Sequence, residues 1–285
     1  MKVSVIIPVY NRLEHLRAGV LCLMKQSTMP DELIISDDGS SQKVLEYIGD
    51  LVPKISFKIK HIYHEDKGFR KTRALNNAVK FSEGEILVFC DQDLIFGEDY
   101  MENIVKNYEQ NTFIMGVAGN TEEIERNKII KRLENKSYSE SIEGLQLECK
   151  KEIQKRIKNG KIRIFLKKLG IKKRGLKLVG MSYALSKEDY IKINGYDEKY
   201  QGWGYEDDDF GNRLTVAGLN GKILETKEPL LHLWHYFDPT KKRNSNGEYY
   251  YKIKRNIFKN KIFKCEYGYD NSIDSDEVKI EILNK

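Results

Sequence analysis

The chain has 285 residues, of which 40% are hydrophobic and 32% are charged, and its formal net charge at neutral pH is +6. This balance is typical of a soluble globular protein with a substantial core. No apolar run approaches the roughly 20 residues that a membrane-spanning helix requires, which excludes a membrane-spanning chain.

The first residues and the cysteines bear on the cellular compartment. Met1 and Lys2 lead straight into an apolar run that is too short for a secretory signal and lacks a cleavage site. The four cysteines are scattered without metal-ligand spacing, and Cys22 and Cys90 lie within apolar runs, as reduced core residues do. We therefore expect a cytoplasmic protein.

Positive charge is concentrated in residues 150–174, which hold twelve Lys/Arg and one acid, Glu152. The rest of the chain is therefore negative overall, at −5, which argues against a nucleic acid partner. Apolar residues are interleaved with the cations of this stretch. The pattern fits a helix lying on anionic lipid, at the inner face of the plasma membrane, or a solvated helix packed on the domain.

Strand-like and helix-like patterns alternate along the first hundred residues. Asn11 is expected to open a helix, with Glu14 as its capping-box partner. The alternation predicts an α/β fold with a mostly parallel sheet flanked by helices, in which ligands bind beyond the carboxyl ends of the strands. The expected strands cover residues 3–9, 32–36, 57–63 and 85–90, and the expected helices cover 11–24 and 72–81.

The alternation stops near Thr121 and resumes near Leu178. The intervening residues have helical, polar and increasingly basic character, which predicts an insertion rather than a core element. The tail from Lys241 is rich in Tyr, Lys and Asn, and its pattern predicts no particular fold.

Acidic residues fall at the expected strand ends. Asp91 and Asp93 follow the strand at 85–90, and alternation along an extended strand would turn both carboxylates to one side and Gln92 to the other. Such a pair suits Mg²⁺ or Mn²⁺ shared with substrate phosphates. The alternative is a turn in which the aspartates bond to their own backbone.

Two further motifs fit a nucleotide ligand. In "SDDGS", Asp37 and Asp38 end the second strand, where a carboxylate can accept hydrogen bonds from a base or a ribose. In "HEDKGFRKTRALNNA", cations gather at a helix start, which suits phosphate or a base edge but equally a solvated basic face. These cations are Lys67, Arg70, Lys71 and Arg73.

In "QGWGYEDDDFGNRL", four acids at 206–209 open an expected helix behind Trp203, which stands between two glycines. The helix dipole stabilises a first-turn acid by about 0.3–1 kcal/mol, which explains one or two acids but not four adjacent like charges. An aromatic face beside carboxylates suits a sugar, and a carboxylate with a raised pKa suits removal of a hydroxyl proton. We therefore favour a functional interpretation of this cluster.

His232 and His235 follow another apolar run, in "LLHLWHYFDP". Three residues apart, they would share a helix face or point to opposite sides of a strand. A histidine in this setting is commonly a core residue. The alternative is a further ligand for a metal at Asp91 and Asp93.

These motifs resemble a known enzyme family. "VSVIIPVYNR", "ISDDGS", "KGFRKTRALNNA" and "FCDQD" look like the donor-binding half of family 2 glycosyltransferases with the GT-A fold. "VGMSYALSKEDYIKINGYDEKYQGWGYEDDDFGNRL" resembles the acceptor side of β-1,4-galactosyltransferases and N-acetylgalactosaminyltransferases. The resemblance implies a donor-binding half at 1–120, a basic helical insertion at 121–177, an acceptor-binding and catalytic half at 178–240, and a C-terminal extension at 241–285.

The resemblance also implies a reaction and its residues. The enzyme would transfer a hexose, with galactose or N-acetylgalactosamine favoured, from a UDP-sugar to a hydroxyl of a saccharide or lipid-linked oligosaccharide. The transfer would invert the anomeric configuration, and it would belong to bacterial surface polysaccharide synthesis. Asp207 would be the catalytic base. The metal, Mn²⁺ or Mg²⁺, would be bound by Asp93 and Asp91 together with His235 or, in its place, His232. The implied donor-binding residues are Pro8, Val9, Tyr10, Arg12, Asp37, Asp38, Arg70, Asp91, Gln92 and Gly180, and the acceptor-binding residues are Trp203, Gly204, Glu206 and Asp208.

Three other functions compete with this one. A sugar-1-phosphate nucleotidyltransferase would need a glycine-rich phosphate loop after the first strand, and "PVYNRLEHL" has none. A glycoside hydrolase would use two carboxylates but no nucleotide pocket. A non-catalytic carbohydrate-binding homologue would keep Trp203 but would need neither the Asp-Gln-Asp motif nor a base.

Overall fold

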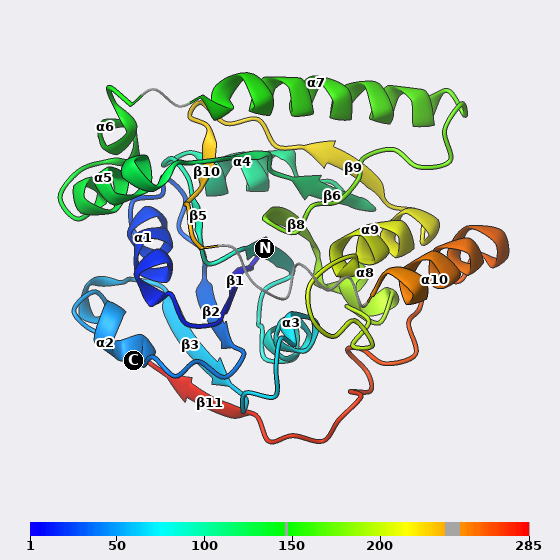
Figure 1. Cartoon of the computed structure of the whole chain (residues 1–285), viewed down its shortest axis with the longest axis horizontal. Coiled ribbons are helices and arrows are strands. Elements are labelled where there is room, and N and C mark those ends of the chain that lie inside the picture. The colour runs from blue at the N-terminus through cyan, green and yellow to red at the C-terminus, as the bar shows by residue number, and fades with distance from the viewer. Residues whose placement is uncertain (146–147, 237–245, 285) are drawn as a thin grey trace.

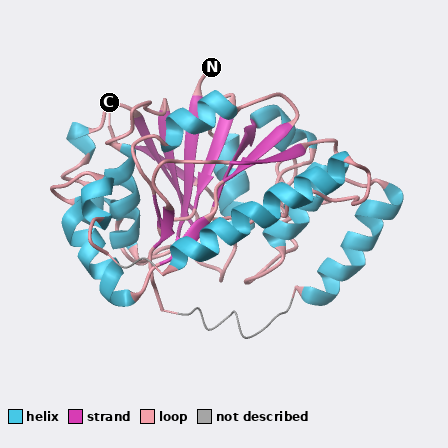
Figure 2. Cartoon of the chain, turned by 90° about the horizontal axis from the view of Figure 1, so that it is seen from above, coloured by secondary structure: helices cyan, strands magenta, loops and turns pink. Residues whose placement is uncertain are grey.

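The structure is a computed structural model that describes residues 1–145, 148–236 and 246–284. A large sheet runs through the molecule, and helices lie on both sides of it (Figures 1 and 2). Its strands are β1 (Val3–Val9), β2 (Glu32–Asp37), β3 (Lys58–Tyr63), β4 (Ile86–Cys90), β6 (Thr112–Met115), β8 (Ser182–Ser186), β9 (Asn220–Ile223) and β11 (Lys279–Ile282).

The strand order in this sheet is β11-β3-β2-β1-β4-β8-β6-β9. β1 pairs in parallel with β2 and β4, and β2 pairs in parallel with β3. β8 is antiparallel to both of its neighbours, and β11 is antiparallel to β3. The central strands are short apolar runs buried on both faces, as covered parallel strands are. The α/β fold predicted from the sequence is thereby confirmed.

A second, small sheet stands beside the large one and has the order β5-β10-β7. Its strands are β5 (Leu94–Ile95), β7 (Ala118–Asn120) and β10 (Leu230–His232). The helices are α1 (Leu13–Leu23), α2 (Val44–Ile48), the 3₁₀ turn η1 (Val52–Lys54), α3 (Lys71–Lys80), α4 (Tyr100–Asn107), α5 (Glu123–Leu133), α6 (Tyr138–Ile142), α7 (Cys149–Lys168), α8 (Lys187–Lys192), α9 (Glu206–Val216) and α10 (Gly247–Asn260). None of these described helices has both the length and the apolar character needed to cross a bilayer.

The start of α1 differs from the expected capping box. Asn11 and Arg12 both have positive φ, at 51° and 49°, so the helix begins only at Leu13. The Asn11 side chain accepts hydrogen bonds from the backbone N–H groups of Ser41 (2.9 Å) and Gln42 (3.2 Å). Asn11 therefore joins the loop after β1 to the loop after β2, and Glu14 has no capping role.

The described residues of 121–177 contain the helices α5, α6 and α7, and α5 and α7 pack on the rest of the domain. Ile129 and Leu133 of α5 are fully buried in the core. The basic helix α7 packs on β7 and β9 through Ile153 and Gly160, and a side chain at Gly160 would collide with Ile223. The first half of α7 is thus part of the domain that carries the small sheet (Figure 1).

The C-terminal region, for which the sequence predicted no fold, returns to the domain. α10 packs on α9, and β11 adds an edge strand to the sheet beside β3. Between them, Asp274 and Asp276 form ion pairs with Arg70, and Asp276 also pairs with Lys67. The segment therefore neutralises cations at the start of α3.

Candidate active site

A cavity of about 820 Å³ opens at the carboxyl ends of β1, β2 and β4. The first residues of α3 and α9, the end of β10, the end of β7 and one residue of α7 also contribute to its wall. The predicted site residues that line it are Pro8, Val9, Tyr10, Arg12, Asp38, Asp91, Gln92, Asp93, Gly180, Trp203, Glu206, Asp207, His232 and His235. The other four predicted site residues are described by the structure but do not line the cavity: Asp37, Arg70, Gly204 and Asp208.

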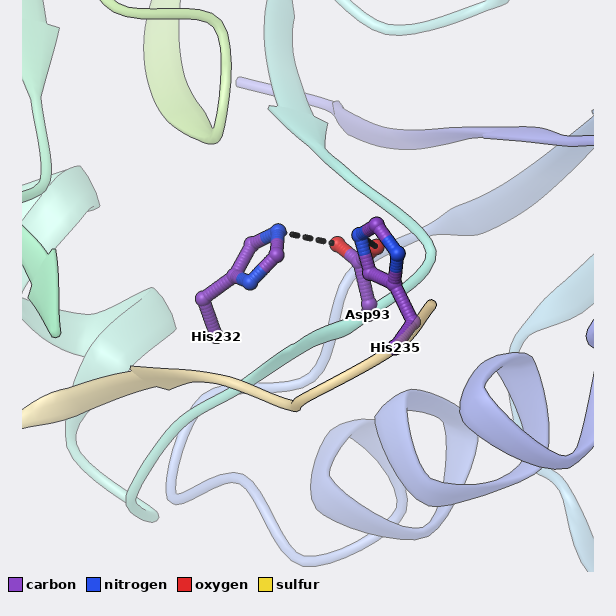
Figure 3. A group of neighbouring side chains, drawn as sticks. All are labelled: Asp93, His232 and His235. Atoms are coloured by element: carbon purple, nitrogen blue, oxygen red, sulfur yellow. Dashed lines mark ion pairs between the residues drawn. The ribbon is translucent and has the colours of Figure 1, made fainter. Parts of the chain in front are cut away.

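Asp93, His232 and His235 form a candidate metal centre. His232 Nε2 lies 3.1 Å from one carboxylate oxygen of Asp93, and His235 Nε2 lies 3.3 Å from the other (Figure 3). One ligand atom from each residue can be chosen so that all three lie within 4.8 Å of one another. Burial opposes ionisation of Asp93, yet His232, Arg12 and His235 hold its pKa below the usual range. The carboxylate is thus anionic at neutral pH, as a metal ligand must be.

Both histidines belong to this centre, although the sequence analysis treated them as competitors. His232 ends β10, and the chain then leaves the strand, so the alternation expected along an extended strand does not apply to His235. The backbone N–H of Leu233 donates to the carbonyl oxygen of Asp93 (2.8 Å), which fixes the two segments against each other.

Asp91 lines the cavity but has a different partner. The chain turns directly after β4, with the N–H of Leu94 donating to the carbonyl oxygen of Asp91 (3.0 Å). The strand alternation expected for Asp91 and Asp93 is therefore lost. The Asp91 carboxylate lies 2.6 Å from Lys71 Nζ, and among the described residues the group that fits a metal does not include it.

The loop after β1 is positioned by Gln92. The Gln92 side chain accepts from the backbone N–H of Tyr10 (2.8 Å) and donates to the carbonyl oxygen of Asn11 (3.1 Å). Arg12, in the left-handed conformation, reaches Asp93 at 3.4 Å. The arrangement places a cation beside the candidate metal centre, where a diphosphate would need one.

The two aspartates of "SDDGS" have separate roles. Asp38 faces the cavity, contacts His64 Nε2 (2.7 Å) and accepts from the backbone N–H of Arg70 (2.7 Å), while burial raises its pKa. Asp37 instead contacts His61 (3.1 Å) and accepts from the N–H of Ser40 (2.7 Å). The Asp37 carboxylate closes the turn after β2 and is not among the cavity lining residues, and the donor contact predicted for it stays a prediction.

Arg70 has partners in the C-terminal region. Its guanidinium lies against Asp276 (2.6 Å) and Asp274 (3.1 Å), and Arg70 is not among the cavity lining residues, so the contact to uridine stays a prediction. Of the four cations in this motif, Lys71 is the one that lines the cavity. Burial opposes the charge of Lys71, but Asp91, Asp207 and Glu206 raise its pKa above the usual range.

The four acids at the start of α9 divide into two pairs. Glu206 and Asp207 face the cavity. Asp208 is buried against Arg174 and Tyr250, and Asp209 is paired with Arg213 (2.7 Å). Helical geometry turns Asp208 into the contact with α10, and the acceptor contact predicted for it stays a prediction.

Asp207 is held at the cavity wall by two donors. Its carboxylate accepts from the backbone N–H of Gly180 (3.2 Å) and from the hydroxyl of Tyr196 (2.9 Å). Any side chain at Gly180 would collide with this carboxylate. Gly180 is thus required for the position of Asp207, a role that the sequence analysis did not identify. Tyr196 was missed because nothing in its local pattern distinguishes it from a core tyrosine.

Trp203 and Gly204 lie on the loop before α9. Trp203 lines the cavity and is 42% exposed. Gly204 contributes backbone alone: its N–H donates to the Glu206 carboxylate (2.9 Å), and its carbonyl oxygen accepts from Asn246 (3.1 Å). The acceptor contact predicted for Gly204 is therefore replaced by a role in positioning Glu206.

Glu206 supplies a test of this geometry. Burial, and then the charge of Asp207, raise the pKa of Glu206 to about 7. A glutamate in an unfolded chain titrates near about pH 4.3, so Glu206 favours the folded state most below that pH and loses this contribution as the pH rises through 7.

We expect Glu206→Gln to raise the melting temperature relative to wild type at about pH 8 and to have little effect at about pH 5. The control is Glu46→Gln, on the exposed surface of α2. Thermal unfolding across this pH range checks the prediction, and parallel pH profiles for wild type and Glu206→Gln would contradict it.

The comparisons with known proteins show the family of the chain. Residues 4–172, more than half of the chain, match the profile of Glycosyl transferase family 2. Residues 160–236 match the profile described as the N-terminal domain of galactosyltransferase. The chain belongs to glycosyl transferase family 2.

Curated relatives cover the chain only in part. The chain is 22% identical over 234 residues to validoxylamine A glucosyltransferase of Streptomyces hygroscopicus subsp. limoneus, which covers 76% of this chain and 48% of that protein. It is 24% identical over 235 residues to chondroitin synthase of Escherichia coli, covering 78% of this chain and 33% of that protein. The chain thus spans about a third to a half of the length of these relatives.

Solved structures confirm the fold. TarS 1–349 of S. aureus in complex with UDP-GlcNAc has a TM-score of 0.60 at 15% identity, covering 95% of this chain and 69% of that one. The mannosyltransferase PcManGT of Pyrobaculum calidifontis, in complex with GDP-Man and Mn²⁺, has a TM-score of 0.54 at 17% identity, covering 89% of this chain and 60% of that one.

Proposed function

We propose that the protein is an inverting, metal-dependent glycosyltransferase that moves a hexose from a UDP-sugar to a hydroxyl of a saccharide acceptor. The observation that carries the proposal is that Asp93, His232, His235 and Asp207 face one cavity at the carboxyl ends of the central strands. A glycoside hydrolase that works with two carboxylates, or a carbohydrate-binding module, does not need these metal ligands.

The donor would lie between the loop after β1 and the candidate metal centre. Asp38, with its burial and its bond from Arg70, suits the nucleoside, and Arg12 and Lys71 suit the diphosphate. A divalent cation bound by Asp93, His232 and His235 would offset the negative charge that develops on the departing UDP. Two imidazole ligands favour Mn²⁺ over Mg²⁺, which prefers oxygen ligands.

The acceptor would lie against Trp203, Glu206 and Asp207. Asp207 is the proposed base, because it is fixed by Gly180 and Tyr196 and is open to the cavity. It would take the proton of the acceptor hydroxyl as that oxygen attacks the anomeric carbon from the face opposite UDP, which inverts the configuration. Glu206, whose pKa is about 7, can hold a proton and donate it in a hydrogen bond to the acceptor sugar.

The hexose is proposed to be galactose or N-acetylgalactosamine, supported by the galactosyltransferase profile across 160–236 and by the quoted motifs. The implied setting is the synthesis of a bacterial surface polysaccharide. The regions 1–120 and 178–240 are proposed as the donor and acceptor halves of one domain, although positions 237–240, like 241–245, lie outside the described residues.

A panel of UDP-sugars tests this proposal. The protein is incubated with each donor and Mn²⁺, Mg²⁺ or EDTA, and UDP release and thermal stability are measured. We expect stabilisation by UDP with Mn²⁺, weaker stabilisation with Mg²⁺, and UDP release from UDP-galactose or UDP-N-acetylgalactosamine. The absence of any stabilisation by UDP with Mn²⁺ would refute the proposal.

The second half of α7 supports the membrane contact considered for 150–174. Ile162, Phe165 and Leu169 recur at helical spacing and are 47%, 59% and 56% exposed among lysines and arginines. An exposed apolar stripe with surrounding cations suits the surface of an anionic bilayer, where a lipid-linked acceptor would be found.

Co-sedimentation with vesicles tests this contact. We expect binding to phosphatidylglycerol vesicles that falls with salt and is lost in the variant Phe165→Ser with Leu169→Ser. Vesicles of phosphatidylcholine are the control. Equal binding to both kinds of vesicle, or unchanged binding by the variant, would rule out this role for α7.

A further inference from the structure

The cavity extends beyond the donor and metal sites to the helix α7. In the small sheet, β10 lies between β5 and β7, and His232 pairs with Leu94 on one side and Asn120 on the other. Leu94 directly follows Asp93, so Asn120 lies on the side of His232 away from Asp93. Asn120 ends β7, and α7 packs on this strand. Arg156 of α7 lines the cavity.

This part of the wall differs chemically from the rest. Its lining residues are Asn120, Thr121, Arg156, Trp234 and Tyr236. Among these described residues there is no carboxylate, whereas the rest of the wall carries five. The rings of Trp234 and Tyr236 lie 4.8 Å apart at a steep angle. Aromatic faces, an amide, a hydroxyl and a guanidinium are groups that bind a sugar ring bearing an anionic substituent.

The partner of Arg156 sets it apart from the other cations of the wall. Arg12 contacts Asp93 and Lys71 contacts Asp91, so both are held by carboxylates of the cavity. Arg156 pairs instead with Glu152, one turn away on its own helix, and the two side chains are 44% and 54% exposed. Exposed pairs of this kind are weak, so a substrate anion can replace Glu152 at small cost.

The volume of the cavity allows this additional contact. At about 820 Å³, it is near the upper end of the range of roughly 300–1,000 Å³ that single-ligand pockets occupy. The surrounding stretch 150–174 carries a net charge of +11, which raises the local concentration of anions.

We propose that the α7 end of the cavity, which we name the Arg156 subsite (Asn120, Thr121, Arg156, Trp234 and Tyr236), binds an anionic group of the acceptor. The group is a carboxylate or a phosphate, and it lies on the acceptor away from the hydroxyl that reacts at Asp207. The proposal rests on the proposed function, because it assigns the substrate class of the same site. It predicts that the enzyme acts on an acidic saccharide.

Binding to matched oligosaccharides tests the subsite. The probes are a hyaluronan hexasaccharide and its carboxyl-reduced neutral twin, and, for phosphate, a glycerol-phosphate oligomer against its phosphate-free polyol. Affinity is measured with the UDP–Mn²⁺ complex of the protein. We expect at least one anionic probe to bind about tenfold more tightly than its neutral twin, as a bidentate guanidinium contact allows, and the two arms distinguish carboxylate from phosphate.

Two variants assign the effect to Arg156. Arg156→Gln should remove the preference for the anionic probe and leave the affinity for UDP–Mn²⁺ unchanged. Arg163→Gln, an exposed cation of the same helix outside the cavity wall, should keep the preference. The proposal would be overturned if the charged and neutral twins bound equally, or if neither anionic probe bound. It would also be overturned if Arg156→Gln kept the preference, or if this variant lost affinity for UDP to a matching extent. Release of UDP from the donor without acceptor is measured separately, so failure of the transferase proposal itself is recognised independently.

Discussion

Replacement of Asp207 by asparagine is expected to lower the rate of sugar transfer by about two to four orders of magnitude, the usual contribution of a positioned general base. Asparagine keeps the shape of the side chain: its single oxygen can accept from the Gly180 N–H, and its NH₂ group can donate to the Tyr196 hydroxyl, but it cannot take up a proton. Binding of UDP with Mn²⁺ should be unchanged, because Asp207 is not part of the Asp93–His232–His235 centre.

The neighbouring residue provides the matched control for this experiment. Asp208→Asn changes the same chemical group one position along α9, where the carboxylate contacts Arg174 and Tyr250 rather than the cavity. It should lower thermal stability and change the transfer rate only a few-fold. Calorimetry with UDP and Mn²⁺, together with transfer assays, checks both variants. Transfer by Asp207→Asn at the wild-type rate would place the base elsewhere.

The second large effect is expected at Asp93. With UDP and Mn²⁺ at about 100 times their dissociation constant, the wild type should gain about 2.7 kcal/mol of stability. Asp93→Asn should lose this gain, because the anionic ligand shared between His232 and His235 is removed. Transfer should fall by about two orders of magnitude or more, since a bound cation contributes several kcal/mol to the transition state.

Asp50→Asn is the control for Asp93→Asn. Asp50 is an exposed acid that pairs with Arg17 of α1, and neither residue lines the cavity. It should retain the full stabilisation by UDP and Mn²⁺ in a thermal shift assay. If Asp93→Asn also retained this stabilisation, and EDTA removed it, the cation would have to bind at another group.

The central sheet and most of the cavity were predictable because their signals are local. Short apolar runs predict buried strands, and acids directly after them predict side chains at the carboxyl edge of the sheet. Asp38, Asp91 and Asp93 lie there, as predicted. The backbone at the start of α1 was not predictable, because two consecutive residues with positive φ depend on bonds from Ser41 and Gln42 in a distant loop.

Three predicted site residues lie outside the cavity wall because other groups hold their side chains. Asp37 is held by the turn after β2 and by His61, whereas Arg70 and Asp208 contact partners remote in sequence. For Arg70 that partner is Asp276 in the C-terminal region, whose fold had no sequence signal. Arg156 was missed as a cavity residue because the sequence of its basic stretch predicted an insertion and gave no sign of which of its cations faces the cavity.

In the proposed enzyme, one cavity holds UDP and its cation on one side and the base Asp207 on the other. The most direct test is an anomalous difference map from crystals grown with UDP and Mn²⁺. We predict one manganese peak in contact with Asp93, His232 and His235, with the diphosphate beside it and the uridine against Asp38. A manganese ion bound away from these three residues, or UDP bound outside the cavity, would contradict the account.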